Sequence, residues 1–328
     1  MSSSRPYNLR VNFDLSDVQA AWRSKGAELG REIARDAATA TVVMSAARFG
    51  LLDPAADLVS VVMAVEALAA ESPAAGVILA LHSGTALAVA DAARFSSLFS
   101  GETTVAVGLS SDAVPVEEGG RLSGRAPWAA PLTERGLVVV GPRSGGERVA
   151  YAVPLDAPGV TVETVQTAAL AGLVCGHVIL NDAACEPLGA TLPIMTRIRI
   201  LTAAAGLGMG KRALREALAT ARTAHTATAG EQTVQGLLAD AATELDAAMM
   251  MTWKAASADS LSLADASFAK LMATGAAQRA VERATQVVGI ASFQRGHIIE
   301  RLAQDVRALE LFAGRTEALR AAVAEELY

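Results

Sequence analysis

An ordered series of residues near the C-terminus constrains the fold of this chain more than any other feature. The series reads Gln286-Val-Val-Gly289-Ile-Ala-Ser-Phe293, then Glu300-Arg301-Leu-Ala-Gln-Asp305, then Ala313-Gly314-Arg315-Thr-Glu317-Ala-Leu-Arg320. Taken alone, these segments predict a helix end at a glycine, a loop of small residues, a helix, a short break and a last helix. The C-terminal part is therefore expected to be built from helices joined by short connections.

Upstream of this series the hydrophobic pattern changes twice. Residues 1–100 have apolar positions at helical spacing and predict helices at about 13–48, 56–71 and 74–98, the first capped by Asp14 or Ser16. Residues 101–190 contain short apolar runs bounded by glycines, which predict strands near 103–107, 137–140, 149–153, 160–165 and 176–180. From Pro193 the helical period returns in three long stretches.

The fold class expected from this order is mainly α with a small central β-domain. Inside the first long C-terminal helix, Gly206-Leu-Gly-Met-Gly210 predicts close helix packing, since a phosphate loop would not lie within a helical run.

Composition narrows the class of protein. Of the 328 residues, 52% are hydrophobic and 19% are charged, and the net charge of −6 without a Lys/Arg-rich run argues against nucleic acid as a partner. The apolar tract at 58–93 contains charged residues and a proline, so no membrane span is expected. Cys175, Cys185 and the four histidines lack metal-ligand spacing, so no metal site is expected, and the cysteine usage favours the cytoplasm.

The C-terminal series, written as Q-x-x-G-x-x-x-(F/Y), E-R-x-x-x-D and x-G-x-x-E-x-x-R, resembles the C-terminal signature of the acyl-CoA dehydrogenase superfamily of flavoproteins. The order helices, strands, helices also resembles that fold. The resemblance implies a shortened N-terminal helical domain at 1–100, a β-barrel-like middle domain at 101–190 and a four-helix-bundle domain at 191–328.

Other segments extend the resemblance. Gly120-Arg-Leu-Ser-Gly124 followed by Trp128 is similar to a β-domain element of the family, Gln232-Thr-Val-Gln-Gly-Leu-Leu-Ala-Asp240 to Q-x-V-Q-x-x-L-A-D, and Ala269-Lys270 to a helical A-K. The family's cofactor is FAD. The resemblance implies cofactor-binding roles for Trp128, Arg222, His225, Gln286, Gly289 and Glu317.

Those roles differ along the cofactor. The resemblance places Trp128 against the flavin ring and Arg222 at the pyrophosphate of FAD in a neighbouring subunit, where an arginine can pair with phosphate oxygens. Gln286 and Glu317 would contact the adenosine half, and His225 stands where the family has an aromatic residue that contacts FAD. Arg199, Trp128, Arg315 and His82 are expected to line the active site, His82 as a core or pocket-wall residue.

One residue departs from the family pattern at the position that carries its chemistry. The family's catalytic glutamate directly precedes the glycine of the last segment, and this chain has Ala313 there. Some members place the glutamate just before the arginine of the first long helix, and that position is Ile198. The nearest acids, Glu310 and Glu317, are expected to be solvated or interface residues, so the catalytic base is unknown.

Three functions follow from this departure. The first is a base-deficient FAD subunit of a mixed acyl-CoA dehydrogenase acting on an acyl thioester of CoA or a carrier protein; actinobacterial enzymes that oxidise steroid side chains are built this way, which suggests lipid or steroid metabolism. The second is a flavin-dependent monooxygenase or oxidase on the same fold, which needs no such base. The third is a flavin-free binding or scaffold protein. A homo- or hetero-oligomer with another acyl-CoA dehydrogenase-like subunit is expected.

Overall fold

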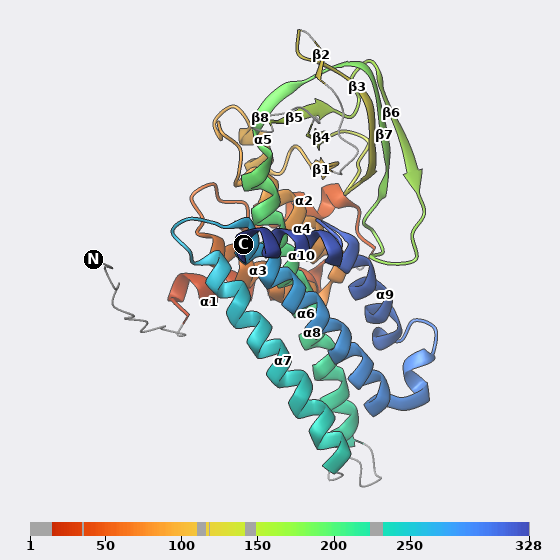
Figure 1. Ribbon diagram of the computed structural model, residues 1–328. Helices are drawn as coiled ribbons and strands as arrows, with labels where there is room; N and C mark the ends of the chain where they lie inside the picture. Colours follow the sequence, from red (N-terminus) through yellow and green to blue (C-terminus); the bar gives the residue numbers. More distant parts are fainter. Residues whose placement is uncertain are drawn as a thin grey trace, which may run out of the picture.

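The computed structural model describes residues 15–34, 36–109, 116–117, 119–141, 149–223 and 232–327. Helices come first, strands follow, and long helices end the chain (Figure 1). The first helices are α1 (Asp17–Glu32), α2 (Thr39–Arg48), α3 (Leu58–Glu71), α4 (Pro73–Ala86) and α5 (Ser96–Ser100). The later helices are α6 (Thr191–Thr223), α7 (Gln232–Ala256), α8 (Leu263–Val288), the 3₁₀ helix η2 (Gly289–Phe293), α9 (Ile298–Leu311) and α10 (Thr316–Leu327).

Two of the predicted N-terminal helices are wrong in extent. The stretch predicted at 13–48 forms two helices, α1 and α2, of which the first begins at a capping box: Ser16 Oγ accepts from Gln19 N–H and the Gln19 side chain accepts from Ser16 N–H. The helix predicted at 74–98 ends at Ala86. Beyond it, Ala90 N–H donates to Leu188 O, a carbonyl of the last strand, so backbone that could continue a helix bonds to a sheet instead.

The strands form two four-stranded sheets (Figure 1). One has the order β1-β4-β5-β8, comprising Val105–Val107, Leu137–Val140, Val149–Pro154 and Glu186–Ala190. The other has the order β2-β3-β7-β6, comprising Val116–Glu117, Arg121–Ala129, Cys175–Ala184 and Val160–Val165. A hydrophobic cluster contains residues from both sheets, among them Val138 and Val153 of the first and Leu122 and Val178 of the second. The sheets are therefore held together by a core of their own.

The second core lies among the helices, and α6 runs through its middle. Every residue from Ile198 to Gly210 is buried, and α3, α4, α7, α8 and α9 all pack on α6. Its cluster combines residues of the early helices, such as Leu68 and Ile78, with residues of the late ones, such as Leu201 and Leu309. None of the helices in the described part of the chain is both long enough and apolar enough to span a membrane.

Glycines inside α6 let the early and late helices approach closely, as the sequence predicted. A Cβ at Gly208 would collide with the backbone carbonyl oxygen of Glu66 on α3, and one at Gly210 would meet Leu245 on α7 and Ala277 on α8. A carbonyl of a packed helix cannot swing away as a flexible side chain can. The distance between α3 and α6 therefore depends on the absence of a side chain at 208.

We expect Gly208→Ala to lower the free energy of unfolding by about 1–3 kcal/mol, because the added methyl group overpacks the contact between α3 and α6. The measurement is urea unfolding at neutral pH. Gly236→Ala is the matched control, since a Cβ at that exposed position of α7 meets nothing within 4 Å. The control should stabilise by about 0.5–1 kcal/mol through helix propensity. Equal stabilisation by both substitutions would contradict the packing argument.

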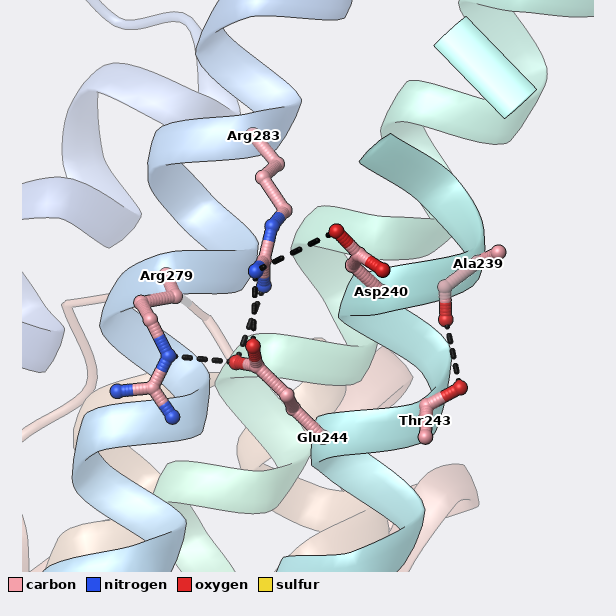
Figure 2. A network of polar contacts seen from close by, with 6 residues as sticks. All are labelled: Ala239, Asp240, Thr243, Glu244, Arg279 and Arg283. Atoms are coloured by element: carbon pink, nitrogen blue, oxygen red, sulfur yellow. Dashed lines mark hydrogen bonds and ion pairs between the residues drawn. The ribbon is translucent and has the colours of Figure 1, made fainter. Parts of the chain in front are cut away.

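Helices α7 and α8 are joined by a network of charged side chains (Figure 2). Glu244 on α7 accepts from Arg279 Nε at 2.5 Å and from Arg283 Nη1 and Nη2 at 3.0 and 2.8 Å, and Arg283 also lies 3.9 Å from Asp240. The hydrogen bonds from Arg283, together with Arg279, lower the pKa of Glu244 to about 2 against the opposing effect of burial. The paired carboxylate therefore stays charged to unusually low pH.

We expect Glu244→Gln to reduce stability at pH 7 and to reduce it much less near pH 2. The folded-state pKa is lowered, so the stabilisation is fully present above the unfolded carboxylate's ordinary value and is lost as pH falls toward about 2. The measurement is the difference in unfolding free energy between wild type and variant at several pH values. Asp246→Asn, on an exposed position of the same helix, is the control. A difference that does not shrink with acid would contradict the prediction.

Candidate active site

The turn between α9 and α10 has an unusual backbone. Ala313 has φ of 57° and Gly314 has φ of 114°, and both values lie in the left-handed region. A residue other than glycine pays a conformational cost there and keeps that conformation only when its surroundings enforce it. The groups that enforce it come from two helices of the bundle, α6 and α8.

Lys270 of α8 binds the turn through hydrogen bonds to backbone carbonyls. Its side chain is completely buried, and its Nζ donates to the carbonyl oxygens of Phe312, Gly314 at 2.8 Å and Glu310 at 3.4 Å. An ammonium group has three N–H donors. All three can be used by the turn, so one side chain fixes the direction of three carbonyls across the end of α9.

Arg199 of α6 binds the carbonyl of Ala313, which lies between those of Phe312 and Gly314. Its Nε donates to Ala313 O at 3.2 Å and its Nη1 to Ser267 Oγ at 2.8 Å, while only 8% of the residue is exposed. A Cβ at Gly314 would lie 3.3 Å from Nη2, so the glycine makes room for the guanidinium. Burial lowers the pKa of Arg199 below its ordinary value. Two cations from two helices therefore bind successive carbonyls of one turn.

The charge of this site is set by these cations and one acid. Burial, together with the neighbouring Arg199, lowers the pKa of Lys270 to about 7, and Glu310 opposes that shift. The Glu310 carboxylate accepts from Thr316 at 2.7 Å, Gln278 at 2.7 Å and Arg307 at 2.6 Å. Burial alone would raise its pKa, but these contacts hold it below the ordinary value. The Glu310 carboxylate is thus fully used by these three donors, and it has a structural role in closing the turn.

The positions where a catalytic carboxylate was sought carry only apolar groups. Ala313 presents a methyl group, and Ile198 is completely buried. Arg315 follows Gly314 directly and is exposed, as is Glu317 in the first turn of α10. The turn is therefore built and held in a strained conformation, with no acid on the residue that it presents.

Trp128 lies in the β part of the chain and exposes a large apolar surface. It is the penultimate residue of β3, is 58% exposed and has φ of 55°. Its backbone N–H donates to His177 Nδ1 at 3.4 Å, and the two rings meet edge to face with centroids 5.5 Å apart. An exposed tryptophan whose backbone and ring are both held by a neighbour is suited to stack on a flat ligand.

The predicted cofactor residues fall into a second group at the other end of the bundle. Arg222 is exposed in the last turn of α6, Gln286 is exposed in the last turn of α8, and Gly289 follows with φ of 72°. Arg199 and Arg222 are separated by 23 residues of one helix, which corresponds to about 34 Å. Helices α6 and α8 both run from the end of the bundle near the strands toward its distal end (Figure 1). One chain therefore does not bring Arg222 and Gln286 to the turn at 312–314.

The remaining predicted residues are placed as follows. His82 is completely buried in α4, with Nε2 2.9 Å from Leu98 O, and burial lowers its pKa to about 4 despite that hydrogen bond. His225 lies outside the described residues. Among the described residues, no group of three or more His, Cys, Asp or Glu side chains could hold a metal ion.

Sequence reasoning missed the roles of Lys270 and His177. Lys270 lies among Ala266, Ala269 and Ala273, which form the buried face of α8, so helical spacing places a charged residue where only small apolar ones are expected. That signal was available from the sequence. His177 gave none, because its contact with Trp128 joins two strands, β3 and β7, that are far apart in the chain.

Comparison with known proteins shows which family the C-terminal part of the chain resembles. Residues 190–328 match the family model "Acyl-CoA dehydrogenase, C-terminal domain". A probable acyl-CoA dehydrogenase of Bacillus subtilis is 29% identical over 208 residues, covering 58% of this chain and 55% of that protein. The 3-sulfinopropanoyl-CoA desulfinase of Paraburkholderia xenovorans is 28% identical over 210 residues, covering 58% and 51%. The matched region thus spans about half the length of these curated relatives.

The fold is shared over nearly the whole chain. The glutaryl-CoA dehydrogenase of Mycobacterium smegmatis in complex with FADH2 superposes with a TM-score of 0.85 at 15% identity, covering 95% of this chain and 95% of that one. The predicted fold class, mainly α with a small β part between helices, is confirmed by this match. The family match shows that residues 190–328 form an acyl-CoA dehydrogenase C-terminal domain, and the curated relatives and the shared fold support membership of the chain in the acyl-CoA dehydrogenase superfamily.

Proposed function

We propose that this chain is an FAD-binding subunit of an acyl-CoA dehydrogenase-like oxidoreductase, and that the acid needed for α-proton removal comes from a partner subunit. One observation carries the proposal: the turn at 312–314 keeps its enforced backbone and both buried cations, yet residue 313 is alanine. A chain with no use for this turn would have no reason to keep two desolvated cations under it, since burying charge is costly.

The described residues fit FAD as two half-sites. Trp128 offers an exposed ring for the flavin, while Arg222, Gln286 and the open surface at Gly289 offer a cation, an amide and an accessible backbone for the pyrophosphate and adenosine. His225 is a further candidate at this distal half-site, while Glu317, which lies beside the turn at 312–314, would contact the adenosine half from the subunit that holds the flavin. Because the half-sites lie at opposite ends of α6, we propose that each FAD is bound between subunits, in a homo- or hetero-oligomer.

When bound, FAD would accept a hydride from the β-carbon of an acyl thioester of CoA or a carrier protein. Arg199 and Lys270 would hold the turn beside the thioester, with Arg315 and Trp128 at its edge and His82 in the wall behind. Removal of the α-proton requires a carboxylate within hydrogen-bond reach of that proton. Ala313 has none, and Glu310 is held by three donors. The partner subunit would supply this group in the cytoplasm, in lipid or steroid metabolism.

The missing acid also favours a second candidate function. A flavin-dependent oxygenase or oxidase on this fold would need no α-proton base, and Ala313 would then be sufficient. The relative named 3-sulfinopropanoyl-CoA desulfinase suggests a related variant, in which a thioester is processed by breaking a carbon–sulfur bond. A flavin-free scaffold is the remaining alternative. It requires no bound flavin, whereas the dehydrogenase subunit and the oxygenase or oxidase both do.

We expect purified protein to carry substoichiometric flavin when produced alone and stoichiometric flavin when co-expressed with an acyl-CoA dehydrogenase-like partner that has the missing glutamate. The measurement is the visible absorption spectrum and the flavin-to-protein ratio. Full flavin loading of the chain alone would favour the oxygenase or oxidase. Colourless protein in both preparations would leave the scaffold.

We expect Arg222→Ala to reduce FAD retention by about tenfold or more, because a charge-assisted bond to phosphate is lost. The free energy of unfolding should be unchanged, since Arg222 is exposed. Arg23→Ala, which removes an exposed arginine of α1, is the matched control and should leave FAD retention unchanged. Equal FAD retention in Arg222→Ala and wild type would contradict the assignment of the distal half-site.

We expect Ala313→Glu to give the flavin-loaded chain without a partner dehydrogenase activity on straight-chain acyl-CoAs, which the wild-type chain should lack under the same conditions. A positioned general base contributes about 100-fold or more. Ala313→Gln, which has the same size and no charge, is the control. Robust turnover by the wild-type homo-oligomer would refute the base-deficient reading.

A further inference from the structure

The buried amine of Lys270 has more acceptors than its neutral form can serve. Three carbonyl oxygens, of Glu310, Phe312 and Gly314, lie within hydrogen-bonding range of one Nζ. An ammonium donates three hydrogen bonds, whereas a neutral amine donates two and directs a lone pair at whatever lies in the third direction. Loss of a proton therefore leaves one of these three carbonyls, two in the turn and one in the last turn of α9, facing a lone pair, and the three can no longer all be bonded at once.

We propose that Lys270 is a positioning residue whose protonation closes the turn at 312–314 and whose deprotonation releases it. The closed turn aims the carbonyl of Ala313 at Arg199, and so fixes both the guanidinium and the direction of side chain 313. Release of a neighbouring carbonyl frees the left-handed backbone at 313, because that conformation persists only while its surroundings enforce it. Lys270 thus acts on the active site through the turn without touching a substrate.

The charges around Lys270 make this proton exchangeable near neutrality. Burial and Arg199 from α6 favour the neutral amine, while Glu310 from α9 favours the ammonium, and together they lower the pKa to about 7. From α10 the turn is closed by the Thr316 hydroxyl, which donates to Glu310. Within the described residues, α7 and α10 contribute no charge that shifts this pKa. The balance depends on one cation and one acid, each on a different helix.

The inference takes from the proposed function only the importance of the turn. We call the closing and release of the turn by the Lys270 proton the latch. The latch is a property of the contacts among α6, α8, α9 and the turn. Amide hydrogen exchange of the full chain reads it out without substrate, partner or activity. A failure of the latch and a failure of the oxidoreductase assignment would therefore be distinguished.

The experiment follows exchange of the peptide covering 311–319 between pH 5.5 and 8.5, corrected for the intrinsic rate at each pH. In wild type we expect a step of about tenfold or more centred near pH 7, since a hydrogen bond to a charged group is lost. Lys270→Met, which has similar length and no donor, should exchange fast at every pH and show no step. Lys211→Met removes a lysine that pairs with Glu66 on α3, and it should keep the wild-type step.

A second variant keeps the test decisive if Lys270→Met does not fold. Glu310→Gln retains an amide that can bond Thr316 but removes the charge that favours the ammonium, so the midpoint should move to lower pH. Corrected exchange that stays flat from pH 5.5 to 8.5 in wild type would overturn the latch. An unshifted midpoint in Glu310→Gln, or an identical step in a folded Lys270→Met variant, would overturn it as well.

Discussion

The hydrogen bonds from two buried cations to one turn are the interaction on which the candidate active site of this protein depends. Lys270 and Arg199 reach the carbonyls at 312–314 from different helices, so the turn is correct only if α6, α8 and α9 are in register. Charge-assisted hydrogen bonds are stronger than neutral ones and lose more when misaligned. The positions of the backbone atoms at 312–314 therefore depend on how the helices of the bundle pack.

That packing rests on small side chains. α6 is buried along Ile198 to Gly210, and neighbouring helices approach it through glycine and alanine. At Gly208 the carbonyl of Glu66 occupies the space that a side chain would need. Interiors packed to this density transmit small displacements, because no free volume absorbs them. The same close contacts that unite early and late helices thus hold the two cations in place.

The length of α6 has a functional consequence. It places Arg199 at one end and Arg222 at the other, so the two groups of candidate residues face different parts of any assembly. A ligand that uses both kinds of group must lie between chains. In the assembly that we propose, a partner subunit can supply an acid that this chain does not have. Under that proposal, alanine at 313 is compatible with the retained contacts of Arg199 and Lys270 to the turn.

Local patterns in the sequence were sufficient where local forces decide. The strands Leu137–Val140 and Val160–Val165 coincide with the predicted runs, since both are rich in β-branched residues, which favour strands, and both directly follow a glycine. The helix end at Gly289 and the break at Gly314 were likewise readable from glycine alone. The end of α4 at Ala86 was not, because the following backbone bonds to a strand about a hundred residues away.

The sequence by itself determined the resemblance to the superfamily, the order of a helical part, a β part and a second helical part, and the absence of an acid at 313. It also carried the anomaly of a lysine on the alanine face of α8. Only the tertiary structure decided what that lysine does, because its acceptors lie some forty residues further along the chain. Hydrogen bonds between segments that are distant in the chain produce no periodic pattern in the sequence, so no local signal predicts them. The fold was therefore predictable from pattern, while the site was determined by contacts that form only once the helices pack.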